Sequence, residues 1–330
     1  MSHLLQRRRQ LITYGAAALG GALFLPGCGG GGSGGGSANQ TIGTQVDQRK
    51  NLMNLAESKP ELSVFVEAVN ACGLRDKLSA SGTNTVFAPT NDAFNALLGE
   101  MGKSKDQLFA DTATLTVILK FHILAKAQFT EAIVEGHAIN PIGGGFFKID
   151  KENNVFKATD GRNRVCTLVG TDIVALNGVL HTLDRVMLPA NMDILITCQS
   201  TPEVSTCVRA INAAGLSDTL EQPGPFTFFC PSDAAFAAVV VELNLTLEAF
   251  LADTALCKRV MTCHMVPARR FKREFDTDAP VTTVQGSTIK INANFQVIDA
   301  RGRVCNLTRA DIININGVVH ICDKVILPAV

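Results

Sequence analysis

The chain contains a long internal repeat, and this repeat limits the possible folds more than any other feature of the sequence. The segment from Thr85 to Phe94 returns at Thr227 to Phe236, a shift of 142 residues without a gap. The segment from Asn177 to His181 returns at Asn316 to His320 with a shift of 139 residues, so the second copy has lost three residues in between. A period this long is that of a whole domain and not of a solenoid unit. The sequence therefore predicts two consecutive copies of one domain.

Each copy has helical patterns first and strand patterns last. In the first copy, a helix is expected from Pro60, a short buried strand from Thr85 to Ala88, and further helices from Thr90, Ser104 and Asp111. The expected later strands cover residues 146–149, 154–158, 165–168 and 178–188. Helices that precede strands in this way predict an α+β domain.

The first 28 residues predict an export signal and not part of a domain. Three arginines, Arg7 to Arg9, precede an apolar stretch from Leu11 to Leu25 that is too short to span a bilayer as a stable helix. Arg8-Arg9 resembles a twin-arginine signal, and export by either the Tat or the Sec route stays open.

The end of the apolar stretch resembles a bacterial lipobox, Leu25 to Cys28. Acylation of the Cys28 thiol would anchor the chain, since each buried methylene contributes about 0.8 kcal/mol. The alternative is a signal peptide without a lipid, in which Cys28 is incidental. Gly29 follows in place of the Asp that often retains lipoproteins at the inner membrane, which favours the outer membrane or the cell surface.

The predicted organisation has four parts. The parts are an export signal peptide with lipobox (1–28), a Gly/Ser-rich tether (29–47), a first domain (48–190) and a second domain (191–330). A Gly/Ser segment behaves as a flexible coil, so it would let the domains stand away from a membrane.

Composition and motifs exclude several classes of function. Lys plus Arg and Asp plus Glu each number 30, which does not favour nucleic-acid binding. Trp is absent and Tyr14 is the one Tyr, so stacking on bases or sugars would depend on Phe. No H-E-x-x-H, G-x-S-x-G or P-loop motif is present, and the sequence predicts neither an enzyme nor a cofactor.

Two segments of each copy resemble the hallmarks of the fasciclin (FAS1) domain family. The first hallmark matches residues 85–94 and 227–236, and the second matches 177–189 and 316–328. The resemblance extends from about residue 48 to the end of the chain. It implies a wedge of β-sheet with helices packed around it, extracellular adhesion by tandem domains, and no shared catalytic centre.

The resemblance also implies candidate partner-binding residues. In some members, Asp-Ile pairs just before the second hallmark contact integrins, and a Tyr-His motif lies between the hallmarks. The matching residues here are Asp172, Ile173, Asp311 and Ile312 for the first motif, and Phe121-His122 and Cys263-His264 for the second. An alternative role for Asp172 and Asp311 is to cap the turn before the following Asn-Gly pair.

Four histidines lie among apolar residues. His122 and His264 each end an apolar helical stripe, where the helix dipole favours a hydrogen-bonded structural histidine. The alternative is a metal ligand or a general base, but no second His or acid lies at ligand spacing on the same helix, so no metal is predicted. His181 and His320 alternate with apolar residues in the closing strand and are expected to be structural or merely exposed.

Ten cysteines are present, and with Cys28 assigned to the lipid anchor an odd number of nine remains. Cys257 and Cys322 occupy positions that hold Leu in the first copy, so they are expected to be small buried thiols. The disulfide pattern stays open.

Adhesion or interaction at the cell envelope is the leading functional prediction. The expected partners are extracellular matrix, or a protein or polysaccharide on a host or neighbouring cell, with the membrane reached through the lipid anchor. Two alternatives remain: an envelope carrier of a small apolar ligand or polysaccharide, and an uncharacterised periplasmic enzyme. A pocket with converging polar groups would favour the carrier, whereas acids and a His in one cleft would favour the enzyme.

Overall fold

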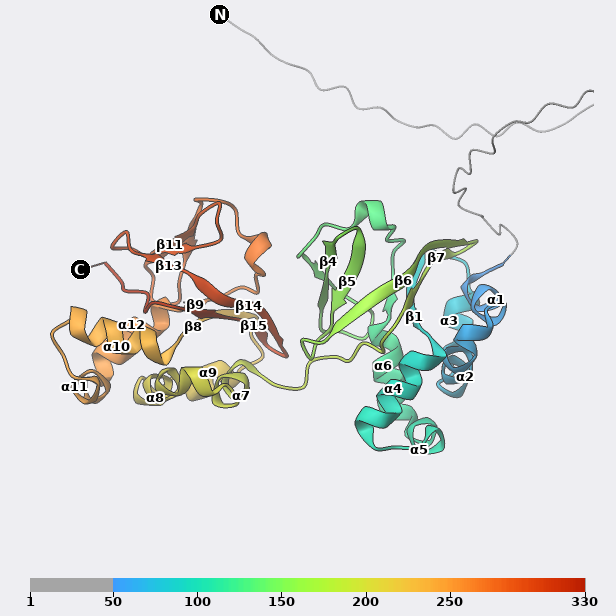
Figure 1. Ribbon diagram of the computed structural model, residues 1–330, viewed down its shortest axis with the longest axis horizontal. Helices are drawn as coiled ribbons and strands as arrows, with labels where there is room; N and C mark the ends of the chain where they lie inside the picture. The colour runs from blue at the N-terminus through green and yellow to red at the C-terminus, as the bar shows by residue number, and fades with distance from the viewer. Residues whose placement is uncertain (1–49, 330) are drawn as a thin grey trace, which may run out of the picture. The chain divides into compact units, whose positions relative to one another are not determined.

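The computed structural model describes residues 50–329, so the predicted signal, Cys28 and the whole tether lie outside the described residues. We call residues 50–190 the first repeat and residues 191–329 the second repeat. In each repeat the helices come first along the chain and gather to one side of the strands (Figure 1). The predicted α+β class is confirmed for both repeats.

The first repeat holds six α-helices, two 3₁₀ turns and seven strands within its described residues. They are α1 (Leu52–Glu57), η1 (Pro60–Leu62), α2 (Ser63–Ala71), α3 (Arg75–Ser79), β1 (Asn84–Pro89), α4 (Asn91–Met101), α5 (Lys105–Ala110), α6 (Thr112–Phe121), β2 (Ile123–Leu124), η2 (Thr130–Ala132), β3 (Ala138–Ile139), β4 (Phe147–Glu152), β5 (Val155–Thr159), β6 (Val165–Ala175) and β7 (Gly178–Leu183).

The second repeat follows the same order of helices and turns. Its elements are α7 (Ile194–Gln199), η3 (Pro202–Val204), α8 (Ser205–Ala213), α9 (Ser217–Glu221), β8 (Phe226–Pro231), α10 (Asp233–Glu242), α11 (Leu247–Ala252), α12 (Thr254–Cys263), β9 (Met265–Val266), η4 (Lys272–Glu274), β10 (Pro280–Thr282), β11 (Thr288–Ile291), β12 (Val297–Ile298), β13 (Val304–Cys305), β14 (Leu307–Asn314) and β15 (Gly317–Cys322).

Side-chain caps fix where the helices begin. The Thr90 hydroxyl accepts a hydrogen bond from the Ala93 N–H at 3.3 Å at the start of α4, and Ser232 does the same at the start of α10. Ser104 and Asp111 cap α5 and α6, as the sequence predicts. Such caps satisfy backbone N–H groups that have no partner inside the helix.

Each repeat contains one pair of parallel strands, β1 with β7 in the first repeat and β8 with β15 in the second. In the first repeat one described sheet runs β2-β1-β7-β6-β5-β4-β3. In the second repeat the strand equivalent to β6 is interrupted at Asn306, so two four-stranded sheets are described in place of one. The closing strand is shorter than predicted and ends at Leu183, because the chain bends at Asp184, whose carboxylate accepts the Thr167 N–H at 2.6 Å.

Candidate functional site

Both Asp-Ile pairs lie on a β-bulge. The register of β6 against β7 shifts just before Ile173, and Asp172 has a φ of 56°. The register of β14 against β15 shifts just before Ile312, and Asp311 has a φ of 63°. This left-handed conformation is uncommon for residues other than Gly, although Asp tolerates it better than most. Each Asp therefore has a backbone conformation that other contacts must stabilise.

In the first repeat, a histidine on the neighbouring strand and a short turn hold the bulge. The Asp172 N–H donates to His181 Nδ1 at 3.2 Å, and His181 Nε2 lies 2.9 Å from the Gln128 carbonyl. The Asp172 carboxylate accepts the Thr130 N–H at 2.9 Å and the Thr130 hydroxyl. Because Nδ1 accepts, the proton of this imidazole lies on Nε2. Burial lowers the pKa of His181 and keeps the ring neutral.

The second repeat uses the same arrangement. The Asp311 N–H donates to His320 Nδ1 at 3.1 Å, and His320 Nε2 lies 3.1 Å from the Arg270 carbonyl. The Asp311 carboxylate accepts the Lys272 N–H at 2.7 Å. Burial is again the main cause that lowers the pKa of His320. In both repeats the Asp carboxylate thus binds the start of the 3₁₀ turn η2 or η4, and not the turn before the Asn-Gly pair that the sequence analysis named.

The two bulges differ in what reaches the second oxygen of the Asp. Lys148, on β4 of the first repeat, places its Nζ 2.8 Å from Asp311 Oδ2 and 3.0 Å from Asp150 Oδ2. The Asp311 side chain is 3% exposed and that of Lys148 is 11% exposed. Burial opposes the charge on Lys148, but attraction to Asp311 and Asp150 outweighs it and raises the pKa of the ammonium group. The Asp311 carboxylate is consequently occupied by the chain itself.

Further contacts from the first repeat cover the second bulge. The Asn163 side chain accepts the Ile313 N–H at 2.6 Å and donates to the Ile313 carbonyl at 3.1 Å. The Phe146 and Phe271 rings pack edge to face with centroids 5.7 Å apart. Ile312 is 7% exposed, so neither residue of the second Asp-Ile pair is open on the surface of the described chain.

The first bulge is accessible. Asp172 and Ile173 are both half-buried, and the preceding Thr171 is exposed. Val169, on the same strand, is 58% exposed although it is apolar. We call Val169, Thr171, Asp172 and Ile173 the bulge surface. Of the two Asp-Ile pairs, only the one in the first repeat can be touched by a partner without separating the repeats.

His122 and His264 are interior residues with both ring nitrogens hydrogen-bonded. His122 Nδ1 lies 2.8 Å from the Ile118 carbonyl, and its Nε2 accepts the Met187 N–H at 3.0 Å. His264 makes the equivalent bonds, and both rings are 0% exposed. Burial lowers the pKa of each histidine to about 4. These rings join the end of a helix to the strand-exit segment, and the folded chain presents neither of them to a partner.

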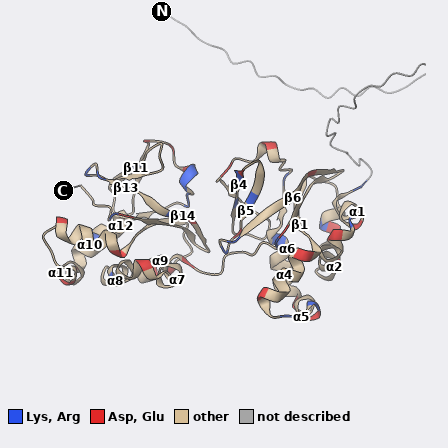
Figure 2. Cartoon of the chain, in the orientation of Figure 1, with Lys and Arg blue, Asp and Glu red and all other residues tan. Residues whose placement is uncertain are grey.

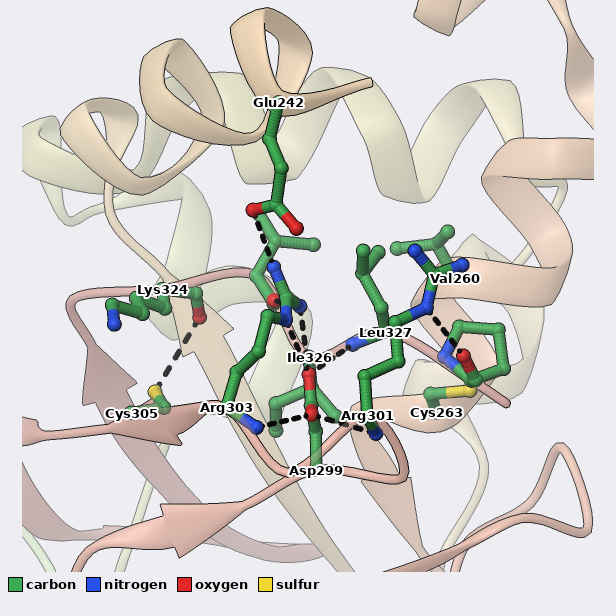
Figure 3. A network of polar contacts seen from close by, with 12 residues as sticks. Glu242, Val260, Cys263, Asp299, Arg301, Arg303, Cys305, Lys324, Ile326 and Leu327 are labelled. Atoms are coloured by element: carbon green, nitrogen blue, oxygen red, sulfur yellow. Dashed lines mark hydrogen bonds and ion pairs between the residues drawn. The ribbon is translucent and has the colours of Figure 1, made fainter. Parts of the chain in front are cut away.

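A buried carboxylate that the sequence analysis did not single out anchors the same exit segment. Asp299 binds the guanidinium of Arg303 at 2.7 Å and accepts the Leu327 N–H at 3.1 Å, while Arg303 also reaches Glu242 at 2.7 Å (Figure 3). Asp160 and Arg164 make the same contacts in the first repeat. We call this Asp–Arg pair, with its bond to the exit segment, the clamp. The Asp-x-x-x-Arg spacing, which occurs in both copies, could have predicted it from the sequence.

The thiols within residues 50–329 are all unpaired. All of them are buried except the half-buried Cys72. Cys257 and Cys322 are both 0% exposed, as predicted. The Cys198 and Cys230 sulfurs lie 3.7 Å apart in the core of the second repeat. Burial raises the pKa of Cys257 to about 11, so this thiol is protonated at neutral pH.

Charges of both signs are distributed over the elements of each repeat (Figure 2). Within residues 50–329, no cluster of three or more His, Cys, Asp or Glu side chains has the geometry of a metal site. None of the helices in this described part has the length and apolar character that a bilayer crossing requires.

Comparison with known proteins decides the family. A model of the fasciclin domain matches residues 60–189 and, a second time, residues 202–328. This chain belongs to the fasciclin domain family. The resemblance carried by the two hallmark segments is thereby confirmed, together with the tandem arrangement.

Individual relatives are similar over different lengths. Human periostin is 26% identical over 288 residues, which cover 86% of this chain but only 32% of periostin. The Synechocystis protein sll1483 is 35% identical over 146 residues, which cover 43% of this chain and 76% of that protein. A solved FAS1 domain pair from the insect cell adhesion molecule fasciclin I covers 81% of this chain and 97% of its own, with 17% identity and a TM-score of 0.39.

Proposed function

We propose that this chain is an exported, non-catalytic interaction protein that is tethered to the cell envelope through acylated Cys28. Its partner is extracellular matrix, or a protein or polysaccharide on a host or neighbouring cell. Its location is the outer membrane or the cell surface. Membership of the fasciclin family and the signal-like N-terminus support this proposal.

The bulge surface of the first repeat is the proposed contact site. One observation carries this choice: Asp172 is partly open, whereas the equivalent Asp311 is closed over by Lys148. Exposed Val169, on the same strand as Asp172, adds apolar area to the bulge surface, and half-buried Ile173 also packs against the core. An apolar anchor next to a charged group is the usual composition of a small recognition surface.

A non-catalytic role is supported by the state of the histidines. The rings of His122, His181, His264 and His320 are buried, and each nitrogen has a backbone partner. A general base must reach a substrate proton within hydrogen-bond distance, and these four rings lie away from the surface.

The test places an arginine on the exposed bulge surface. Cells that display the full chain with Val169→Arg or Thr171→Arg should attach to the partner surface about tenfold less well, the loss expected when one contact of about 1.4 kcal/mol is removed. Thr308→Arg, at the exposed position of the second repeat that is equivalent to Val169, is the matched control and should attach like the parent chain. Equal attachment of all variants at equal surface display would reject the bulge surface as the contact site.

The tether is tested separately. Labelling with a radioactive fatty acid should mark the full chain, and Cys28→Ala should abolish both the label and fractionation with membranes. A labelled Cys28→Ala chain would disprove acylation at this residue without affecting the proposed contact site.

A further inference from the structure

A cavity of about 350 Å³ opens in the first repeat between α6, the end of α4 and the segment that follows β7. This volume lies in the range of small-molecule sites in proteins. Its lining includes Met101, Val117, Ile118, Leu188 and Pro189, together with the charged residue Arg162. The cavity is in a different part of the repeat from the bulge surface and shares no residue with it.

One residue of the apolar wall of this cavity, Val117, is largely exposed. Val117 is 51% exposed although it lies in the middle of α6, where the flanking Ile118 is 3% exposed. A ligand that covered Val117 would remove apolar area from water at about 25 cal/mol per Å². The wall can therefore favour an apolar chain or ring.

Arg162 supplies a positive charge at the same cavity. Its backbone N–H donates to Asp160 at 2.9 Å, but among the described residues its guanidinium has no hydrogen bond or ion pair. The equivalent Arg301 of the second repeat is engaged, because its Nε donates to the Pro328 carbonyl at 3.0 Å. An unpaired guanidinium at the edge of an apolar hollow is suited to a carboxylate, which it can bind with two parallel hydrogen bonds.

The second repeat shows that the fold does not require this cavity. Thr114 and Val117 of the first repeat correspond to Leu256 and Arg259, and Arg259 brings a charge to the middle of the helix. The hollow in this part of the second repeat is lined by a carboxylate and a guanidinium beside Leu256, and not by a continuous apolar wall. The apolar cavity with a free guanidinium is thus a property of the first repeat.

We propose that this cavity binds a free, single-chain carboxylate of medium length, with the chain against Val117, Ile118 and Leu188 and the carboxylate on Arg162. The site goes beyond the proposed adhesive function. It makes the chain a carrier or sensor of amphiphilic acids in addition to an interaction protein, and it operates without a change at the bulge surface.

The experiment uses the full chain with Cys28→Ser, so that no attached acyl group competes for the cavity. Decanoate is titrated by calorimetry below its aggregation concentration, and 1-decanol is the neutral comparison. We expect one saturable decanoate site. Val117→Arg, which copies the second repeat, should weaken binding at least about tenfold. Because Val117 is half exposed, the melting temperature of the Val117→Arg variant should be the same as that of the parent chain.

Arginine variants test the charge. Arg162→Ala should bind decanoate and decanol equally, whereas Arg162→Lys should keep part of the preference for the acid. Arg301→Ala is the matched control in the second repeat and should bind like the parent chain. No saturable decanoate binding, undiminished binding by Val117→Arg, or binding only to phosphatidylglycerol vesicles would overturn the proposal.

Discussion

In the first repeat the Asp172 carboxylate is partly open, whereas in the second repeat the equivalent Asp311 is buried under Lys148. The same bond from the Asp backbone N–H to a histidine holds both bulges, so the backbone arrangement of the two sites is the same. The difference comes from contacts that cross from the first repeat to the second, foremost the bond of Lys148 to Asp311. One copy of a duplicated site thus joins the repeats, and the other is the contact site that we propose for an outside partner.

The two repeats share some contacts and differ in others. Shared contacts are buried and hold the fold, as in the pairs Asp160–Arg164 and Asp299–Arg303. Some differing positions lie at a surface, as with Val117, which is Arg259 in the second copy, whereas others are buried, as with Leu115 and Cys257. The shared clamp therefore holds both repeats, whereas a position such as Val117 gives one repeat a surface that the other lacks.

The largest expected effect comes from the shared clamp. Asp160→Ala and Asp299→Ala should each cost about 3 kcal/mol, because each removes a buried carboxylate that binds a half-buried guanidinium and a buried backbone N–H. Hydrogen exchange with mass spectrometry can assign the loss to one repeat, which fluorescence cannot do in a chain without Trp. The exposed carboxylate of Glu131 is the control, with less than about 0.5 kcal/mol for Glu131→Ala. Unequal costs for the two Asp variants would show that the clamps are not equivalent.

Mild acid should weaken both repeats through their buried histidines. The folded pKa of His122 and His264 is about 4, below the unfolded value of about 6.5, so the unfolded chain binds more protons between these values. The stabilisation that comes from these neutral rings is therefore fully present above about pH 6.5. It decreases as the pH is lowered, by about 2 kcal/mol per ring at pH 5. Urea midpoints from pH 7 to pH 5 measure the slope, and His122→Asn should flatten it for the first repeat alone. A slope that stays unchanged in this variant would contradict the assignment.

The crossing lysine should have a smaller effect that the repeats do not share. Lys148→Met leaves the buried Asp311 without its Nζ partner, which should cost about 1.5 kcal/mol, a value typical of a hydrogen bond to a charged group. Lys290, the equivalent residue of the second repeat, is exposed, so Lys290→Met should change the urea midpoint little. If both variants cost the same, Lys148 does not hold the second bulge.

The sequence predicted the repeat, the fold class and the starts of α4, α5 and α6, whereas the helix expected from Pro60 begins as the 3₁₀ turn η1 and α2 starts at Ser63. Thr90, Ser104 and Asp111 each cap the helix that follows, because capping depends on residues only three positions apart. The closing strand was predicted too long, since the bend at Asp184 depends on a bond to β6. Strand ends in a sheet are set by pairing with distant residues, which a single segment does not reveal.

The difference between the two candidate sites could not be predicted. Lys148 and Asp311 are 163 residues apart. The position equivalent to Lys148 in the second copy also holds a lysine, Lys290. Nothing in the pattern distinguishes a lysine that crosses to another repeat from one in solvent. The free guanidinium of Arg162 was hidden for the same reason, because Arg301 is an identical residue with a different environment.

The smallest expected effect tests whether equal local signals contribute equally. Thr90→Ala and Ser232→Ala each remove the hydroxyl that caps α4 or α10, and each should cost about 1 kcal/mol. Thr90→Ser keeps the hydroxyl and is the control with little change. Because both caps have nearly the same geometry, 3.3 Å and 3.2 Å, a difference of more than a few tenths of a kcal/mol would come from the helices. In that case α4 and α10 would differ in how strongly the surrounding core holds them. The two repeats would then share their backbone arrangement but not the stability of these helices.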